Sequence, residues 1–297
     1  MRVGEALLDL ARADGIRSLF VVGTGKNVGK TVTTRAVAEA ALQRGLRFGL
    51  TSLGRDGEAV DVTDASSKPR LFLRHGALIA TARDVLPRAP ASELVELSPY
   101  STAAGPLVYA RIREPGFFEI VGPPTASAIR SVVARMRELD CEQTIVDGAI
   151  DRVAAVAGGS DAVIVCAGAS GAGTMTEAVD EVHALVKRLT VPAYDPAGAH
   201  VRVAGALTAA LAARHASLAS TGMQIVVRDP TQIAITGKAL LGMMQQLDVR
   251  CERPLRVVAA TVASIGRERY FEPRAFLQDV ARATGLPVFD VYAAQAA

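Results

Sequence analysis

The chain has 297 residues, of which 50% are hydrophobic and 21% charged, enough apolar material for one large α/β domain or two smaller ones. A formal net charge of +3, with no basic stripe that interleaves aromatic residues, argues against a nucleic-acid-binding protein. Tryptophan is absent and aromatic residues make up 4%, so the core must be built from Ala, Val, Leu and Ile, as in buried parallel strands flanked by helices rich in small residues.

The first elements expected along the chain are a helix, a strand and a second helix. Residues 1–15 form an amphipathic pattern with acidic residues, which fits neither a signal peptide nor a transit peptide. An apolar strand is predicted at 18–23 and a helix at about 29–44, followed by a strand at 47–52. Short apolar runs that alternate with helical patterns are typical of βα units around a parallel sheet.

A glycine-rich loop joins the first strand to the helix that follows. The stretch VVGTGKNVGKTVTT, residues 21–34, has the order strand, glycine loop, helix that a phosphate-binding loop requires. Glycines let successive backbone N–H groups converge on one anion, and the helix N-terminus adds partial positive charge. The residues predicted to contact a nucleotide are Gly23, Thr24, Gly25, Lys26, Asn27, Val28, Gly29, Lys30, Thr31 and Val32.

Individual roles follow from the chemistry of these side chains. Lys30 would place an ammonium group on the β- and γ-phosphates, and Thr31 would offer its hydroxyl to Mg²⁺. Lys26 either meets the γ-phosphate or a substrate, or is a solvated loop lysine. Asn27 has a similar ambiguity, because Asn also tolerates unusual loop dihedrals. Thr24 stands where the motif usually has its first glycine.

A polar loop follows the second strand, in the sequence TSLGRDGE at 51–58. In a doubly wound sheet this loop opens on the same edge as the phosphate loop. It is either a solvated loop or a second-substrate or switch loop that brings Asp56 or Glu58 near the metal. The polar residues concerned are Thr51, Ser52, Arg55, Asp56 and Glu58.

The middle of the chain supplies a second candidate ligand for Mg²⁺. Residues 107–123 are expected to form a β-hairpin turned at Glu114-Pro115-Gly116, followed by a helix at 125–139 and a strand at 143–148. Asp147 ends that strand, where a carboxylate can bind the cation or its water shell; the alternative is a helix cap. Just beyond, Arg152 either stabilises the γ-phosphate or pairs with Asp151.

The last part of the chain continues the α/β pattern after a strand at 161–168. Further strands are predicted at 223–229, 256–264 and 286–292, and helices at 173–189, 203–217, 235–247 and 273–284. Loop-like composition at 193–200 suggests a boundary between two parts of the chain. These are a P-loop nucleotide-binding part, 1–192, and a C-terminal α/β part, 193–297. The second part either continues the same sheet or forms a subdomain. The fold expected is a three-layer α/β P-loop NTPase with a mostly parallel central sheet.

Cysteines, histidines and hydropathy exclude several classes of site. Cys141, Cys166 and Cys251 lie far apart and are predicted to be buried thiols in a reducing compartment. The four histidines lack the spacing of metal ligands. No apolar stretch reaches the roughly 18 residues that a membrane span needs. We therefore expect a cytoplasmic protein with no membrane or nucleic-acid partner.

Two resemblances extend this interpretation. Gly23-Thr24 leading to Gly29-Lys30-Thr31, with Asp147-Gly148-Ala149 later, resembles the dethiobiotin synthetase and cobyrinate amidase branch of P-loop proteins, over roughly residues 18–190. That likeness implies a parallel sheet that binds MgATP. Dethiobiotin synthetases carry Lys-Pro where this chain has Thr51-Ser52, and an acidic loop residue where it has Lys26-Asn27, which argues against biotin chemistry.

The second likeness runs along more of the chain. Six blocks resemble the reactivase subunit of lysine 5,6-aminomutase: KNVGKT (26–31), TSLGRDGE (51–58), KPRLFL (68–73), ALIATA (77–82), EIVGP (119–123) and VDGAIDR (146–152). This family is understood to use ATP to exchange damaged cobalamin for fresh cofactor, together with a second subunit. The resemblance implies ATP and Mg²⁺ as cofactors, and an adenosylcobalamin-dependent aminomutase and a companion reactivase subunit as partners. Many P-loop relatives also form homodimers.

Three functions are consistent with these residues. The first is an ATPase that acts on a partner, with Lys30, Lys26, Asp147 and Arg152 as candidate catalytic residues and Thr31, Asp147 and Asp56 as candidate metal ligands. The second is an ATP-dependent ligase that activates a small carboxylate or carbamate. The third is a nucleotide-binding module without turnover. Asp229 and Arg267 are further candidates for an interface or pocket, with no mechanism attached.

Overall fold

The computed structural model describes residues 2–13, 15–53, 70–148, 161–170, 172–266 and 269–292. It divides into two compact units, Met1–Val22 with Lys30–Ala155 and Gly23–Gly29 with Val156–Ala297. These units divide the chain at a different place from the predicted boundary between residues 192 and 193, because the residues from 161 to 192 belong with the C-terminal part. Each unit is α/β, as expected from the alternating pattern; the first combines parallel with antiparallel strands, and the strands of the second are parallel.

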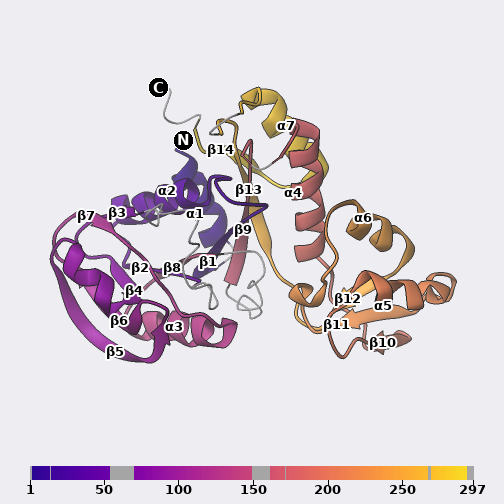
Figure 1. Ribbon diagram of the computed structural model, residues 1–297, viewed down its shortest axis with the longest axis horizontal. Helices are drawn as coiled ribbons and strands as arrows, with labels where there is room; N and C mark the ends of the chain where they lie inside the picture. Colours follow the sequence, from indigo (N-terminus) through magenta and orange to yellow (C-terminus); the bar gives the residue numbers. More distant parts are fainter. Residues whose placement is uncertain are drawn as a thin grey trace. The chain divides into compact units, whose positions relative to one another are not determined.

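The first unit is built on six strands in the order β1-β8-β2-β4-β6-β5 (Figure 1). The first four are parallel to one another. Strand β6 is antiparallel to β4, and β5 is antiparallel to β6. Figure 1 shows α1 and α2 on one side of these strands and α3 on the other. The bounds of the elements are β1 Ser18–Gly23, β8 Gln143–Asp147, β2 Phe48–Ser52, β4 Leu78–Ala82, β6 Gly105–Ile112, β5 Ser92–Thr102, α1 Val3–Ala13, α2 Lys30–Gln43 and α3 Ala126–Glu138.

The predicted hairpin over 107–123 is wrong. Instead β6 pairs with β5, and the chain reverses at Thr102–Gly105, where Gly105 has φ +109° and the Thr102 hydroxyl donates to the Gly105 carbonyl. The segment after Pro115 forms β7, Gly116–Phe118, which pairs with β3, Leu71–Leu73, in a separate antiparallel ribbon. The sequence did not predict β5 as a partner of β6, because β5 is mostly exposed and contains a proline, so it lacks the apolar run of a buried strand.

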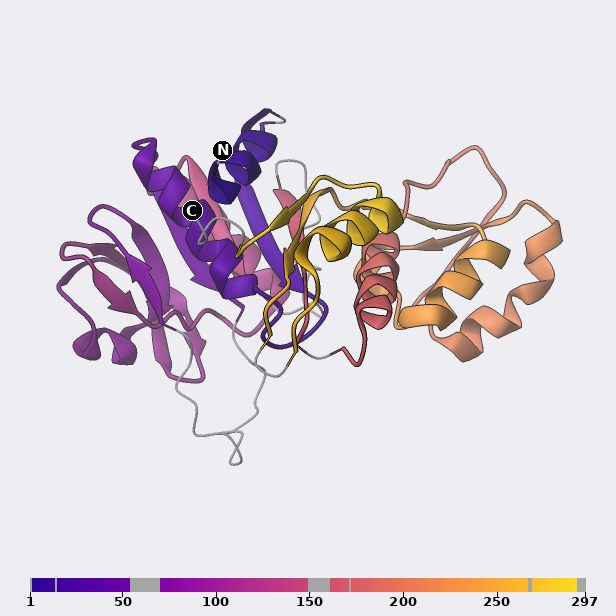
Figure 2. The same cartoon turned by 90° about the horizontal axis from the view of Figure 1, so that it is seen from above.

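The second unit contains a parallel sheet of three strands in the order β14-β13-β9. The strands are β9 Asp161–Gly168, β13 Val257–Ala263 and β14 Val288–Asp290, and the helices α4 Met175–Leu189 and α7 Pro273–Thr284 pack against each other (Figure 2). A capping box of Thr174 and Glu177 begins α4, and Gly285 with φ +69° ends α7. The predictions of a strand at 161–168 and a helix at 273–284 are confirmed.

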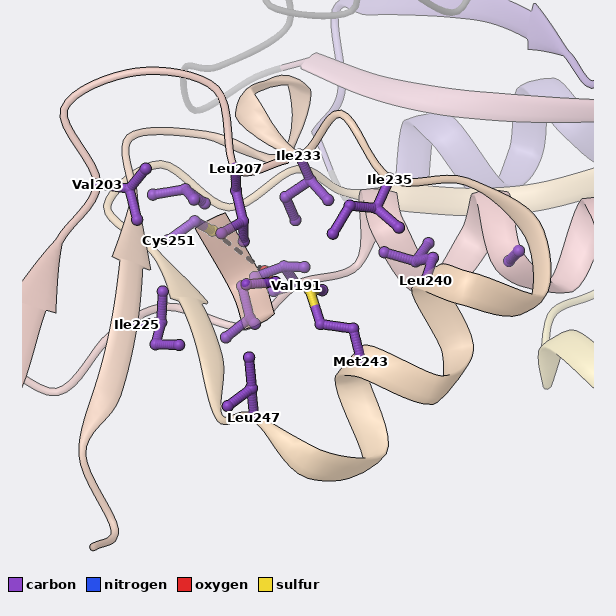
Figure 3. Packing of buried hydrophobic residues seen from close by; sticks show 14 residues of the cluster. Val191, Val203, Leu207, Ile225, Ile233, Ile235, Leu240, Met243, Leu247 and Cys251 are labelled. Atoms are coloured by element: carbon purple, nitrogen blue, oxygen red, sulfur yellow. Dashed lines mark hydrogen bonds between the residues drawn. The ribbon is translucent and has the colours of Figure 1, made fainter. Parts of the chain in front are cut away.

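A second parallel sheet of this unit has its own hydrophobic core. Its strands are β10 His200–Arg202, β11 Gln224–Val227 and β12 Val249–Cys251, with α5 Ala209–Arg214 and α6 Gly237–Gln246. Figure 3 shows side chains from these strands and from α6 meeting in that core. The helix predicted at 203–217 is too long, because Leu207 is buried in the core and pairs in extended conformation with Ile233.

The three cysteines are buried and form no disulfide, which confirms the prediction of buried thiols. Burial raises the pKa of the Cys141 thiol to about 12 and that of Cys251 to about 11, so both remain protonated at neutral pH. Within the described residues, none of the helices is both long and apolar enough to cross a lipid bilayer.

Two helical glycines should respond in opposite directions to the same substitution. A Cβ at Gly4 of α1 would overlap the Ala36 carbonyl oxygen of α2, whereas a Cβ at Gly242 of α6 would meet nothing within 4 Å. We expect Gly4→Ala to lower the free energy of unfolding by about 1–3 kcal/mol through overpacking. Gly242→Ala should raise it by about 0.5–1 kcal/mol, the usual gain of Ala over Gly in a helix. Urea unfolding of both variants checks this, and a stabilising Gly4→Ala would contradict the helix packing.

Candidate functional site

The glycine loop joins a strand to a helix, and two of its residues have positive φ. Strand β1 ends at Gly23 and helix α2 begins at Lys30, so residues 24–29 form the connection. Asn27 with φ 58° and Gly29 with φ 92° both lie in the left-handed region. A Cβ at Gly29 would also lie 3.1 Å from the Cβ of Ala263, so both conformation and space favour glycine there.

Strand β9 holds the loop in place. The Thr24 N–H donates to the Cys166 carbonyl at 3.0 Å. Val28 is buried against the end of the same strand, where a Cβ on Gly168 would lie 2.7 Å from the Val28 Cα. Small residues such as glycine let another segment approach the backbone closely. Here Gly168 allows the chain's own loop to approach.

The loop presents backbone donors that the described chain does not use. The N–H groups of Asn27, Val28 and Gly29 form no hydrogen bond with any described residue, although Val28 and Gly29 are buried. Buried backbone N–H groups are almost always paired with an acceptor. Successive donors in a loop that includes left-handed residues form a concave site for an anion. The loop is therefore suited to a phosphate group.

Asp147 and Lys30 form a charged group within the first unit. Asp147 is the last residue of β8 and lies in register with Val21 of β1 and Ser52 of β2, at the carboxyl ends of these strands. Burial raises the pKa of Asp147 to about 6, and the positive charge of Lys30 offsets part of that effect. A bound cation would favour the ionised carboxylate further. A desolvated carboxylate whose pKa is influenced by a nearby lysine charge is typical of a functional site.

Thr51 and Ser52 have structural roles. The buried Thr51 hydroxyl donates to the Ala80 carbonyl at 3.0 Å. The Ser52 hydroxyl donates to the Ile120 carbonyl at 2.9 Å and accepts the Gly122 N–H at 3.1 Å. Both hydroxyls thus link β2 to neighbouring segments, and neither has a proton left to donate to a substrate.

The remaining candidates are divided between the loop, the helix and parts of the chain that the structure does not describe. Lys26 and Asn27 are exposed, and Thr31 and Val32 are half-buried in the first turn of α2. The residues outside the described ones are Arg55, Asp56, Glu58, Asp151, Arg152 and Arg267. No group of three or more His, Cys, Asp or Glu side chains that could hold a metal occurs among the described residues.

Two further carboxylates have clear structural partners. Asp229 is buried and caps the short 3₁₀ helix Pro230–Gln232 by accepting the Thr231 N–H, and it also accepts from Arg228. Asp229 therefore has a structural role within the fold. That role explains its presence without the interface or pocket that the sequence suggested. Asp290, which sequence reasoning missed, accepts from the Ser264 hydroxyl and the Tyr292 N–H, each at 2.8 Å. A polar residue directly after an apolar strand was the available signal for this pair.

The predicted site residues thus fall into two groups. The loop donors at 27–29 belong to one unit, and Lys30 and Asp147 belong to the other. Comparison of the chain with protein-family models, with curated proteins and with solved structures found no match.

Asp147→Asn should stabilise the protein in the absence of ligand. Because the folded-state pKa of about 6 exceeds the ordinary value of 3.8, the folded protein binds more protons than the unfolded protein between these values, and stability falls as pH rises from about 4 to about 6. The Asn variant avoids this loss, so its free energy of unfolding at pH 8 should exceed that of wild type by about 3 kcal/mol.

Urea unfolding of both proteins from pH 4.5 to pH 8 measures the difference. Asp279→Asn is the matched control: Asp279 is half-buried, its i,i+3 partner Arg282 on α7 is exposed, and the change should alter stability by less than about 0.5 kcal/mol. An Asn variant that is less stable than wild type at pH 8 would show that the Asp147 carboxylate has a stabilising partner.

Proposed function

We propose that this chain is a P-loop protein that binds ATP with Mg²⁺ at residues 23–32. The observation that carries the proposal is the set of unused N–H donors of Asn27, Val28 and Gly29, two of them on buried residues, directly before the helix that begins at Lys30. A triphosphate would give these donors the acceptors that they lack and would lie at the positive end of the α2 dipole. The fold class proposed is accordingly the three-layer P-loop NTPase.

Each side chain has a role in this proposal. Lys30 would neutralise the β- and γ-phosphates, and Thr31 and Asp147 would hold Mg²⁺ directly or through water. Mg²⁺, when bound, neutralises charge on the phosphate oxygens. The raised pKa of Asp147 supports this assignment, because a desolvated carboxylate gains most from a nearby cation. Lys26, Arg152 and the metal ligand Asp56 keep the roles that the sequence suggested.

The reaction we propose is ATP hydrolysis coupled to a protein partner, as in the aminomutase reactivases that the chain resembles. One observation favours it over the ligase of dethiobiotin synthetase type. The hydroxyls at Thr51 and Ser52, where those ligases carry Lys-Pro for the carboxylated amine, donate within the fold. The partners proposed are an adenosylcobalamin-dependent aminomutase and a companion subunit, and the reducing cytoplasm is the proposed compartment.

Lys30→Ala should weaken nucleotide binding while the chain stays folded. Loss of one charge-assisted contact to phosphate, worth about 1.5–3 kcal/mol, corresponds to an affinity for MgATP lower by roughly 10- to 100-fold. Titration calorimetry with MgATP measures this. Lys187→Ala, an exposed lysine on α4, is the matched control and should bind as wild type does. Equal affinity in wild type and Lys30→Ala would remove the proposed site.

ADP production should rise when the partner is present. We expect the purified protein to hydrolyse ATP about 10-fold faster in the presence of its companion subunit and an adenosylcobalamin-dependent aminomutase that holds damaged cofactor than it does alone. This increase corresponds to an activation free energy lower by about 1.4 kcal/mol. The same assay with a panel of amino and carboxylic acids tests the ligase. Stimulation by a metabolite alone would replace the first reaction with the second, and ATP binding without turnover in any condition would leave a binding module.

A further inference from the structure

Strand β5 leaves one long edge of the first unit unpaired. It is the outermost strand of the order β1-β8-β2-β4-β6-β5, and no strand in the described part of the chain pairs with its outer edge (Figure 1). Leu94 is 53% exposed and Leu97 is 62% exposed, the two largest values among the apolar side chains of this strand. An edge strand with exposed apolar residues offers backbone donors and acceptors to another strand.

A β-bulge places both leucines on one face. Leu94 pairs with Ala110 and Leu97 pairs with Val108 of β6, and the register shifts between Leu94 and Glu96, so Val95 is the extra residue. Ala110 and Val108 are two residues apart and therefore share a face of the sheet. Without the bulge, residues three apart on one strand would point to opposite faces. The irregularity thus creates a continuous apolar pair at the edge.

The charged side chains of this edge strand are both acidic, and both are engaged in ion pairs. Residues 92–102 contain no Lys or Arg. The two acidic residues are engaged within the first unit, Glu93 with Arg113 of the chain after β6 and Glu96 with Arg135 of α3, the latter at 2.5 Å. Natural edges are commonly blocked by lysine, proline or a covering segment, and in β5 the proline is Pro99, so the edge proposed for pairing lies before that residue.

We propose that β5 pairs antiparallel with β5 of a second copy of this chain across a two-fold axis, with Leu94 opposite Leu97 of the partner. This goes beyond the nucleotide site and does not depend on it. A two-fold axis makes the contact self-complementary, so both Leu94–Leu97 pairs form together and four leucines gather on one face. Pro99 lacks an N–H group and ends the paired segment.

Charge selects this register over its neighbours. With Leu94 opposite Leu97, Glu93 faces Ser98 and Glu96 faces Val95 of the other copy. A shift by one residue in one direction places Glu96 opposite Glu96, and a shift by two in the other direction places Glu93 opposite Glu96. The remaining one-residue shift sets Leu97 against Glu93. Like charges directly opposite each other destabilise a strand pair, and leucine pairs stabilise it.

Cysteine cross-linking tests the register directly. Leu94→Cys and Leu97→Cys are prepared as separate proteins, and each is oxidised alone and as an equal mixture. Opposed positions lie about 4.5–5.5 Å apart between Cβ atoms, close enough for a disulfide after small adjustments. We expect a covalent dimer in the mixture and none in either protein alone, while the buried native cysteines stay unreactive. Cross-links in a single variant to the same extent as in the mixture would overturn the register.

Sedimentation equilibrium tests the dimer itself. Leu97→Lys should raise the dimer dissociation constant by about 100-fold, because it replaces the two leucine contacts across the axis with two buried ammonium groups. Phe117→Lys, which changes a 57% exposed side chain on β7, is the matched control and should leave the constant unchanged. A wild-type chain that is monomeric at all concentrations, or a dimer that both variants weaken equally, would overturn the proposal.

Discussion

The contact between Val28 and Gly168 is the constraint on which the loop conformation depends. A buried valine anchors the loop to the end of β9, and only a residue without a Cβ permits that approach. The hydrogen bond from Thr24 to Cys166 holds the other end. With its ends anchored, the loop keeps the N–H groups of residues 27–29 away from acceptors of the described chain. Donors held in this way need no rearrangement to bind an anion.

The candidate site carries an electrostatic cost that a ligand would relieve. Asp147 is desolvated at the end of a buried strand, and the attraction of Lys30 compensates only in part, so the pKa of the carboxyl remains well above its ordinary value. A chain selected for stability alone would place a neutral residue there. Retention of such a group is common where function requires a charge, because stability and function then pull in opposite directions.

Strand β5 was not predicted from the sequence, because it lies at the edge of the sheet. An interior parallel strand such as β1 is buried along its whole length and appears in the sequence as an apolar run. The strand at 92–102 is mostly exposed, contains Pro99 and is interrupted by a bulge at Val95, so neither an apolar run nor strict alternation identifies it. Because β5 lies at the edge, it lacks the sequence pattern of a buried strand. The same position leaves its outer side available to a second copy.

Local sequence determined the buried elements and the glycine loop. Apolar periodicity and capping residues predict the strands at 18–23 and 161–168 and the helix at 273–284. The glycine at position 29 is suited to the positive φ that the loop has there. These properties depend on a few neighbouring residues. Only the tertiary structure decided which strands pair, that the hydroxyls of Thr51 and Ser52 are used within the fold, and that Asp147 is desolvated beside Lys30. These depend on contacts between residues far apart in the chain, which no local pattern encodes.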